Sequence, residues 1–129
     1  MSAQPYFDQS RPPSDEPGRF VRVDTLDPLV LLDGLEFRPI TTDAVMTNFV
    51  TFEPDAEAPM HHHVEQQIAI VLSGTLTFTV GGETRVMSAG ECVVIPPDVP
   101  HGGTAGPEGC TALDVFTPPR AGILEAMAG

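Results

Sequence analysis

The four histidines of the chain stand in two short segments, and a metal site built across strands needs ligands from two such segments. In a strand, residues i and i+2 point to the same side, so His61 and His63 project together and His62 projects away. An unbroken strand would turn Gln67 toward the same side, and His101 would join from elsewhere in the fold. These residues predict a metal site with three imidazoles and one amide oxygen as ligands.

This ligand set suits a divalent transition metal, and zinc, nickel, iron, manganese and cobalt all stay open. Because the four ligands are neutral, the metal would keep its full charge. That charge favours Lewis-acid chemistry, such as polarising a carbonyl or acidifying a bound water. A second interpretation also stays open, in which the adjacent histidines form a polar loop without a metal. Glu65 is either a further ligand or a solvated acid of that loop.

An acidic residue interrupts the apolar segment near the C-terminus. Asp114 and Phe116 share one face of the strand expected there, and Arg120 follows shortly afterwards. A carboxylate on an apolar strand is costly to bury without a partner or a function. Asp114 could therefore be a general acid or base, and Arg120 could bind a substrate carboxylate. The alternative is structural: Asp114 pairs with an arginine or caps a turn, and Arg120 lies on the surface.

The composition limits the classes of partner and the compartment. The net charge of −12, with six arginines and no lysine, argues against nucleic acid or an anionic membrane as a partner. Cys92 and Cys110 form no Cys-x-x-Cys pair and are expected to be buried free thiols. The sequence has no long apolar stretch and no signal-peptide core, so we expect a cytoplasmic protein. The absence of lysine beside abundant alanine, glycine and proline suggests a bacterial genome rich in GC.

Short β-like segments separated by glycine and proline fill the chain from residue 19 onward. Gln67–Leu72 is almost continuously apolar and predicts a strand buried on both faces. Thr75–Val80 alternates cleanly, and Gly81-Gly82 predicts a two-residue hairpin because both central positions of a type I′ turn need positive φ. Further strands are expected at residues 20–23, 29–32, 35–40, 45–52, 83–87, 92–95 and 111–116. We therefore predict an all-β, antiparallel sandwich or barrel.

The length of 129 residues indicates one domain. Residues 1–18 are rich in proline and polar side chains, and we expect them to form a flexible N-terminal arm. Residues 19–129 would then form a single barrel domain. Within it, Glu53–Pro59 is expected to be a loop, and only residues 123–128 could hold a helical turn.

The two histidine segments resemble the two sequence motifs of the cupins. The first cupin motif, a His-x-His pair followed by Glu or Gln and then Gly, is matched by His61, His63, Gln67 and Gly74. The second, a Gly followed by Pro-x-Gly and then His, is matched by Gly90, Pro96, Asp98 and His101. Three positions depart from the common pattern: Gln67 replaces Glu, Asp98 replaces Gly, and Ala105 replaces a frequent Asn. The resemblance implies an antiparallel double-stranded β-helix, the jelly-roll barrel of a small single-domain cupin.

The end of the chain is similar to the cupins that linearise unsaturated uronates in pectin and alginate breakdown. That resemblance implies His61, His63, Gln67 and His101 as metal ligands. It also implies Asp114, Phe116 and Arg120 as residues that line the substrate site. The metal would polarise the ring oxygen or a carbonyl, Asp114 would move the proton, and Arg120 would hold the carboxylate.

Several functions compatible with this site stay open. The first is a metal-dependent isomerase or lyase that acts on a small carboxylate-bearing substrate. A second function with similar chemistry is that of a polyketide cyclase. An arginine-lined mouth would suit a uronate, whereas a wide apolar cavity would suit a polyketide. The others are a non-catalytic ligand-binding cupin and an iron-dependent oxygenase, which would need Glu65 at the metal. In each case the partner is a small molecule, and small cupins commonly pair as homodimers through a sheet edge.

Overall fold

The structure is a computed structural model that describes residues 5–129. Within those residues the chain forms two short 3₁₀-helices, eight strands and one α-helix. In chain order they are η1 (Pro5–Phe7), η2 (Val23–Thr25), β1 (Leu29–Leu32), β2 (Leu35–Thr41), β3 (Met46–Phe52), β4 (Glu57–His61), β5 (Gln66–Val80), β6 (Glu83–Ser88), β7 (Cys92–Ile95), β8 (His101–Thr117) and α1 (Ala121–Ala128).

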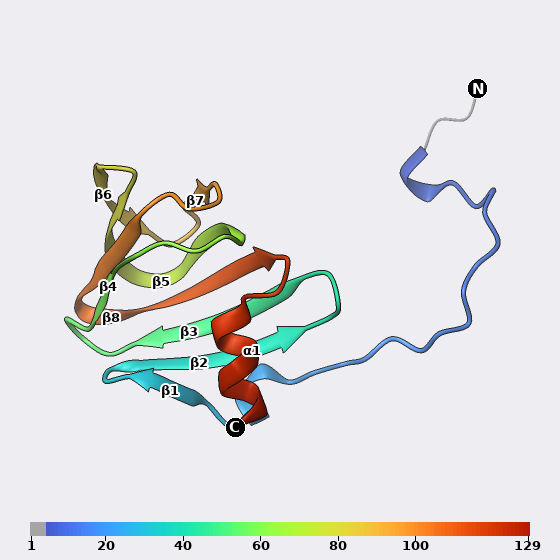
Figure 1. The fold of residues 1–129 in the computed structure, drawn as a ribbon, viewed down its shortest axis with the longest axis horizontal. Helices are drawn as coiled ribbons and strands as arrows, with labels where there is room; N and C mark the ends of the chain where they lie inside the picture. The colour runs from blue at the N-terminus through green and yellow to red at the C-terminus, as the bar shows by residue number, and fades with distance from the viewer. Residues whose placement is uncertain (1–4) are drawn as a thin grey trace.

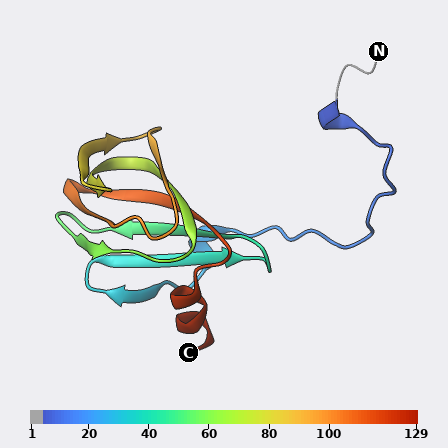
Figure 2. The same cartoon turned by 45° about the horizontal axis from the view of Figure 1, so that its top comes forward.

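Two long strands, β5 and β8, join the two sides of the barrel because they pair with each other along most of their lengths. On one side the strand order is β1-β2-β3-β8-β5-β7, and on the other it is β4-β8-β5-β6. Every pair is antiparallel. Figures 1 and 2 show the two sides facing each other across the interior. The predicted all-β, double-stranded β-helix is confirmed.

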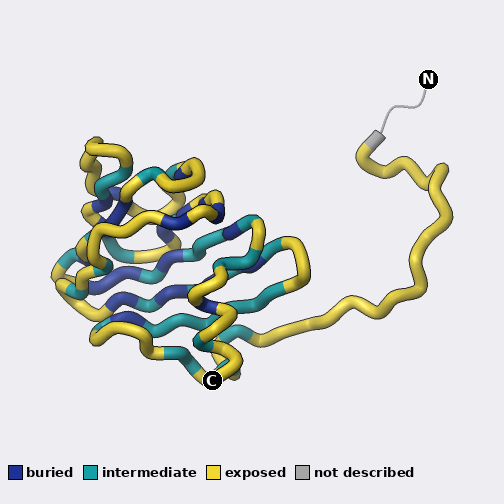
Figure 3. The backbone as a smooth tube through the Cα atoms, viewed as in Figure 1, coloured by how far each residue is buried: buried dark blue, intermediate teal, exposed yellow. Residues whose placement is uncertain are grey.

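The barrel interior is filled by alternate residues of the strands. On β3 the buried positions are Met46, Asn48, Val50 and Phe52, and the residues between them are half-buried. Figure 3 shows the same alternation along the central strands. Burying one large apolar side chain contributes about 1.5–3 kcal/mol, so this inward row does much to hold β3 in place. Asn48 is the polar exception in that row.

The predicted turn between β5 and β6 is confirmed: Gly81 and Gly82 have φ values of 58° and 85° and connect the two strands. The prediction that Gln67–Leu72 is buried on both faces is wrong. Ile68 and Leu72 are 41% and 46% exposed, and Ile70 between them is half-buried. The apolar run therefore has one face in the core and the other only partly covered.

Two other segments differ from the expectation. Part of the predicted loop Glu53–Pro59 forms β4, because Glu57 and Ala58 pair with the first half of β8. Residues 20–23 form no strand, and the last of them begins the 3₁₀-helix η2. Cys92 and Cys110 are both free, but only Cys110 is buried as expected, because Cys92 is exposed at the start of β7.

Helix α1 covers one part of the barrel, as Figure 1 shows. Its buried residue Ile123 packs with Met46 of β3 and Phe116 of β8. The helix begins directly after Arg120, so this packing fixes where that arginine lies. The helical turn expected at residues 123–128 is confirmed and begins two residues earlier.

The N-terminal segment is exposed along residues 6–22 and runs away from the barrel in Figure 1. The division into a flexible arm of residues 1–18 and a domain of residues 19–129 stays a prediction, and residues 1–4 of that arm lie outside the described residues. Among the described residues, no helix combines the length and apolar character needed to span a membrane.

Gly74 allows β5 and β8 to approach closely at the bend of the barrel. Its φ is +72°, and a Cβ added there would collide with the carbonyl oxygen of Gly109. We expect Gly74→Ala to lower the free energy of unfolding by more than the strain alone, which is about 1–3 kcal/mol. Denaturant unfolding beside Gly82→Ala, where the added Cβ meets no atom within 4 Å, would measure the effect of the collision. Equal losses in both variants would contradict it.

Candidate metal centre

Three histidines gather at one end of the barrel interior. His61 ends β4, His63 follows in the connection to β5, and His101 begins β8. The pairing of β4 with β8 sets His61 opposite His101. The candidate ligand atoms of the three side chains lie within 4.8 Å of one another, so the three could hold one metal ion.

A hydrogen bond to a backbone carbonyl orients each imidazole. His61 and His101 both donate from Nδ1 to the carbonyl two residues earlier, at 2.8 Å, and His63 donates to the carbonyl two residues later, at 2.9 Å. A carbonyl can only accept, so the proton is on Nδ1 and the lone pair is on Nε2 in all three rings. Metal-binding histidines are oriented in this way.

Gln67 supplies a fourth donor atom from β5. Its Nε2 donates to Oδ1 of Asp114 at 2.9 Å, which turns its Oε1 toward Nε2 of His63, 3.1 Å away. Both of these atoms carry lone pairs and no proton, so a cation between them would satisfy both. Nε2 of His101 is likewise buried without a partner among the described residues. Three imidazole nitrogens and an amide oxygen with unmet acceptors fit a divalent transition metal.

Burial keeps two of the imidazoles in the form that binds a metal. Desolvation lowers the pKa of His101 to about 4, although its hydrogen bond to the Val99 carbonyl acts in the opposite direction. Desolvation also lowers the pKa of His63, and the positive charge of Arg120 adds to the effect. A neutral imidazole can bind a metal without first losing a proton.

Strand β8 places Asp114 and Phe116 on the inward face beside the histidines. The hydrogen-bond donor to Asp114 is the amide of Gln67, not an arginine. Desolvation raises the pKa of the Asp114 carboxyl to about 7, while the Gln67 hydrogen bond lowers it. The ring of Phe116 lies 5.6 Å from the His63 ring, measured between centroids, so it forms the apolar wall next to the candidate ligands.

Glu65 has a role that neither sequence interpretation predicted. Its side chain is buried, and its Oε2 accepts a hydrogen bond of 2.8 Å from the backbone N–H of Ala121, at the start of α1. Its Oε1 lies 3.8 Å from Nη1 of Arg120 and 3.5 Å from Nδ1 of His63. Burial alone would raise the pKa of Glu65, but the Ala121 hydrogen bond and the charge of Arg120 outweigh it and lower that pKa. Glu65 therefore connects the histidines, Arg120 and α1.

We expect Glu65→Gln to weaken the hold on Arg120 while leaving the metal bound. The amide can still accept from Ala121 but no longer attracts the guanidinium. A hydrogen bond to a charged group, such as that from Ala121 to the carboxylate, contributes about 1.5–3 kcal/mol, and part of this is lost with the charge. Thermal unfolding and metal analysis would measure this, with Glu125→Gln on the exposed face of α1 as the control. Loss of the metal from Glu65→Gln would instead make Glu65 a ligand.

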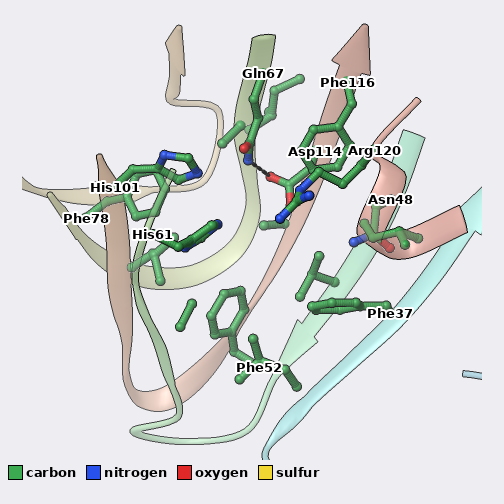
Figure 4. A pocket seen from close by; sticks show the side chains of 18 of the residues that line it. Phe37, Asn48, Phe52, His61, Gln67, Phe78, His101, Asp114, Phe116 and Arg120 are labelled. Carbon is green, nitrogen blue, oxygen red and sulfur yellow. Dashed lines mark hydrogen bonds between the residues drawn. The ribbon is translucent and has the colours of Figure 1, made fainter. Parts of the chain in front are cut away.

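The seven residues singled out from the sequence line one cavity of about 230 Å³. Figure 4 shows six of them by label around it, with Arg120 and Asp114 on one side and His61 and His101 on the other. Most of the remaining wall is apolar. Asn48 also lines the cavity and was not among the residues predicted from the sequence. What could have indicated it is its amide among the apolar inward residues of β3.

The barrel and its histidine cluster define a class of protein, the cupins. The family model described as "Cupin domain" matches residues 48–116, and the chain therefore belongs to the cupin family. The pectin degradation protein KdgF of Dickeya dadantii (strain 3937) is 32% identical over 94 residues, which are 71% of this chain and 86% of that protein. The solved structure of KdgF from Halomonas sp. matches with a TM-score of 0.78 and 27% identity, over 83% of this chain and 99% of that chain.

A further relative is matched over a shorter region. The H2HPP isomerase of Bacillus subtilis is 50% identical over 50 residues. These residues are 38% of this chain and 21% of the isomerase, so the likeness concerns a small part of that protein. The relatives suggest a cupin enzyme of the isomerase or lyase type, with a histidine cluster able to bind a metal.

Proposed function

We propose that this cupin is a metal-dependent isomerase that opens the ring of a small unsaturated uronate. The observation that carries the proposal is the placement of three kinds of group on one cavity wall: the histidine cluster with Gln67, the carboxyl of Asp114, and the guanidinium of Arg120. The likeness to KdgF, whose name refers to pectin degradation, supports this substrate class. Unsaturated uronates are products of pectin cleavage.

In this proposal His61, His63, Gln67 and His101 hold the metal. The metal would supply a Lewis acid that stabilises negative charge on a substrate oxygen. That oxygen would be bound at the end of the cavity where the candidate ligand atoms of the three histidines lie within 4.8 Å of one another. Phe116 keeps water from the side of the site next to His63.

Asp114 would move the proton. In a 4,5-unsaturated uronate, ring opening breaks the bond between C1 and the ring oxygen. The C1 hydroxyl loses its proton to leave an aldehyde, and C4 gains a proton as the ring oxygen becomes the C5 ketone. One proton is taken and one is given, so the reaction is an isomerisation. Asp114 projects into the cavity and is held by Gln67, so its carboxyl can accept the first proton and deliver one to C4.

Arg120 would hold the substrate carboxylate. The Arg120 side chain is 26% exposed and lines the cavity, which places it at the boundary between the interior and solvent. Its planar fork of N–H groups matches a carboxylate through two parallel hydrogen bonds. The Glu65 carboxylate, 3.8 Å from the Arg120 guanidinium, attracts this group but forms no hydrogen bond with it. The N–H groups of Arg120 would therefore stay available to the substrate.

The cavity volume favours a monosaccharide over a polyketide. Pockets for larger, drug-sized ligands have volumes of about 300–1,000 Å³, and this one has about 230 Å³. The iron-oxygenase hypothesis required Glu65 among the ligands, and that carboxylate contacts Ala121 and Arg120 instead. Both features support the isomerase over these two alternatives.

The test uses the unsaturated galacturonate released from pectate by a lyase. Ring opening removes the conjugation between the alkene and the carboxylate, so ultraviolet absorbance falls, and NMR identifies the keto product. We expect the metal-loaded protein to catalyse this loss, a chelator to stop it, and added metal to restore it. Absence of turnover in the metal-loaded protein would refute the proposed reaction and favour the non-catalytic ligand-binding alternative.

A further inference from the structure

Asn48 is a buried residue whose carboxamide oxygen has no hydrogen-bond partner among the described residues. It is 1% exposed, and the unpaired atom is its Oδ1. The other inward residues of β3, which are Met46, Val50 and Phe52, are apolar. A buried acceptor without a partner destabilises a protein, so an apolar residue would serve the fold better at this position.

The position of Asn48 links it to the proposed chemistry. Its Cα pairs in register with that of Asp114 on the neighbouring strand β8. Residues directly opposite in an antiparallel pair have their side chains on the same face and their Cβ atoms about 5 Å apart. Figure 4 shows the Asn48 amide in the cavity wall on the side of Asp114 and Arg120.

The two polar neighbours do not occupy the amide of Asn48. The hydrogen bond of Asp114 comes from Gln67, and Arg120 lies beside Glu65. Asn48 therefore lines the same cavity as the carboxyl and the guanidinium, and neither of these groups pairs with its Oδ1. A ligand with a hydroxyl group would satisfy it, because a hydroxyl donates one hydrogen bond and a carboxamide oxygen accepts one.

We propose that Asn48 is a specificity-determining residue whose Oδ1 accepts a hydrogen bond from a hydroxyl group of the bound substrate. This inference rests on the proposed function, because it places a hydroxylated sugar acid in the cavity. The substrate carboxylate would contact Arg120, and the hydroxyl would lie toward β3, next to Asp114. A substrate without that hydroxyl would leave the amide unpaired and would bind less well.

The test compares wild type with Asn48→Leu, which has a similar volume and no polar atoms. The control is Thr51→Val, which makes the same change of polarity on the other face of β3, outside the cavity. We expect Asn48→Leu to retain its metal and to have a melting temperature equal to or above that of wild type. We also expect kcat/KM for unsaturated galacturonate to fall about 10- to 100-fold, as the loss of one buried hydrogen bond predicts.

Two results would overturn the role of Asn48. One is an unchanged kcat/KM in Asn48→Leu. The other is a melting temperature several degrees lower together with metal loss, which would show that the amide supports the fold. If wild type does not turn over the uronate, the proposed reaction fails separately, and calorimetric binding of D-galacturonate decides the role of Asn48. Binding at least about ten-fold weaker in Asn48→Leu would support it, and equal binding, or no binding to wild type, would overturn it.

Discussion

Alanine in place of His63 or His101 is expected to empty the metal site. Each substitution removes one of three convergent Nε2 atoms and leaves too few ligands for a stable four-coordinate ion. Wild type should hold about one transition metal ion per chain. Both variants should hold almost none after dialysis, and turnover should fall to the background rate. Elemental analysis of untagged protein measures the first effect, and the ultraviolet assay measures the second.

His62→Ala is the matched control for these variants. His62 is exposed, and its Nδ1–H donates to the carboxylate of Asp98, outside the cluster. It should keep both the metal and the activity. Metal loss from His62→Ala equal to that from His63→Ala would show that the triplet binds metal as a flexible surface sequence, contrary to the geometry of the site.

Asp114→Asn is expected to lower kcat by about 10²–10⁴-fold, the usual contribution of a general acid or base. The asparagine oxygen can still accept the hydrogen bond from Gln67, so the fourth ligand keeps its orientation. The metal content should therefore stay at the wild-type level. Single-turnover kinetics together with metal analysis separate the loss of proton transfer from the loss of the site.

The exposed residue Asp43 provides the control for that change of charge. Asp43→Asn should have wild-type kinetics. Full activity in Asp114→Asn would contradict the assigned role in proton transfer. A variant that loses both the metal and the activity would show instead that Asp114 only orients Gln67.

The candidate ligands were found from the spacing of the two motifs, but the unbroken strand expected from His61 to Gln67 does not form. His61 ends β4, His63 lies in the connection that follows, and Gln67 begins the inward row of β5 after that break. His101 was found from its place in a second motif, and the pairing of β4 with β8 explains how it reaches the others. The turn at residue 98 also forms as the motif requires, because Asp98 adopts a φ of 61° in place of the usual glycine.

The roles of Glu65 and Asn48 were not predictable from spacing, because each depends on contacts between distant segments. Glu65 is buried where α1 begins, and it accepts a hydrogen bond from the N–H of Ala121, 56 residues further along the chain. The sequence offered one signal for Asn48, an amide in line with the apolar residues Met46, Val50 and Phe52, but this signal indicates no role. The significance of Asn48 follows from its register with Asp114 and from the absence of a partner among the described residues.

The differences between the expected and the observed strands also come from contacts between segments distant in the sequence. β4 forms from an acidic, proline-containing segment because β8 offers it a strand to pair with, and strand pairing overrides local preference. The outer face of β5 exposes Ile68 and Leu72, although the run they belong to is typical of a buried strand. Homodimer formation, a cytoplasmic location and a bacterial origin stay predictions.

The central claim is that one transition metal lies between His61, His63, Gln67 and His101. The most direct test is an anomalous difference map from a crystal of untagged protein, recorded at the absorption edge of the metal that elemental analysis identifies. We predict one strong peak about 2.0–2.3 Å from the three Nε2 atoms and from Oε1 of Gln67. Metal-loaded crystals with no peak there, or with a peak that Gln67 does not contact, would contradict this account.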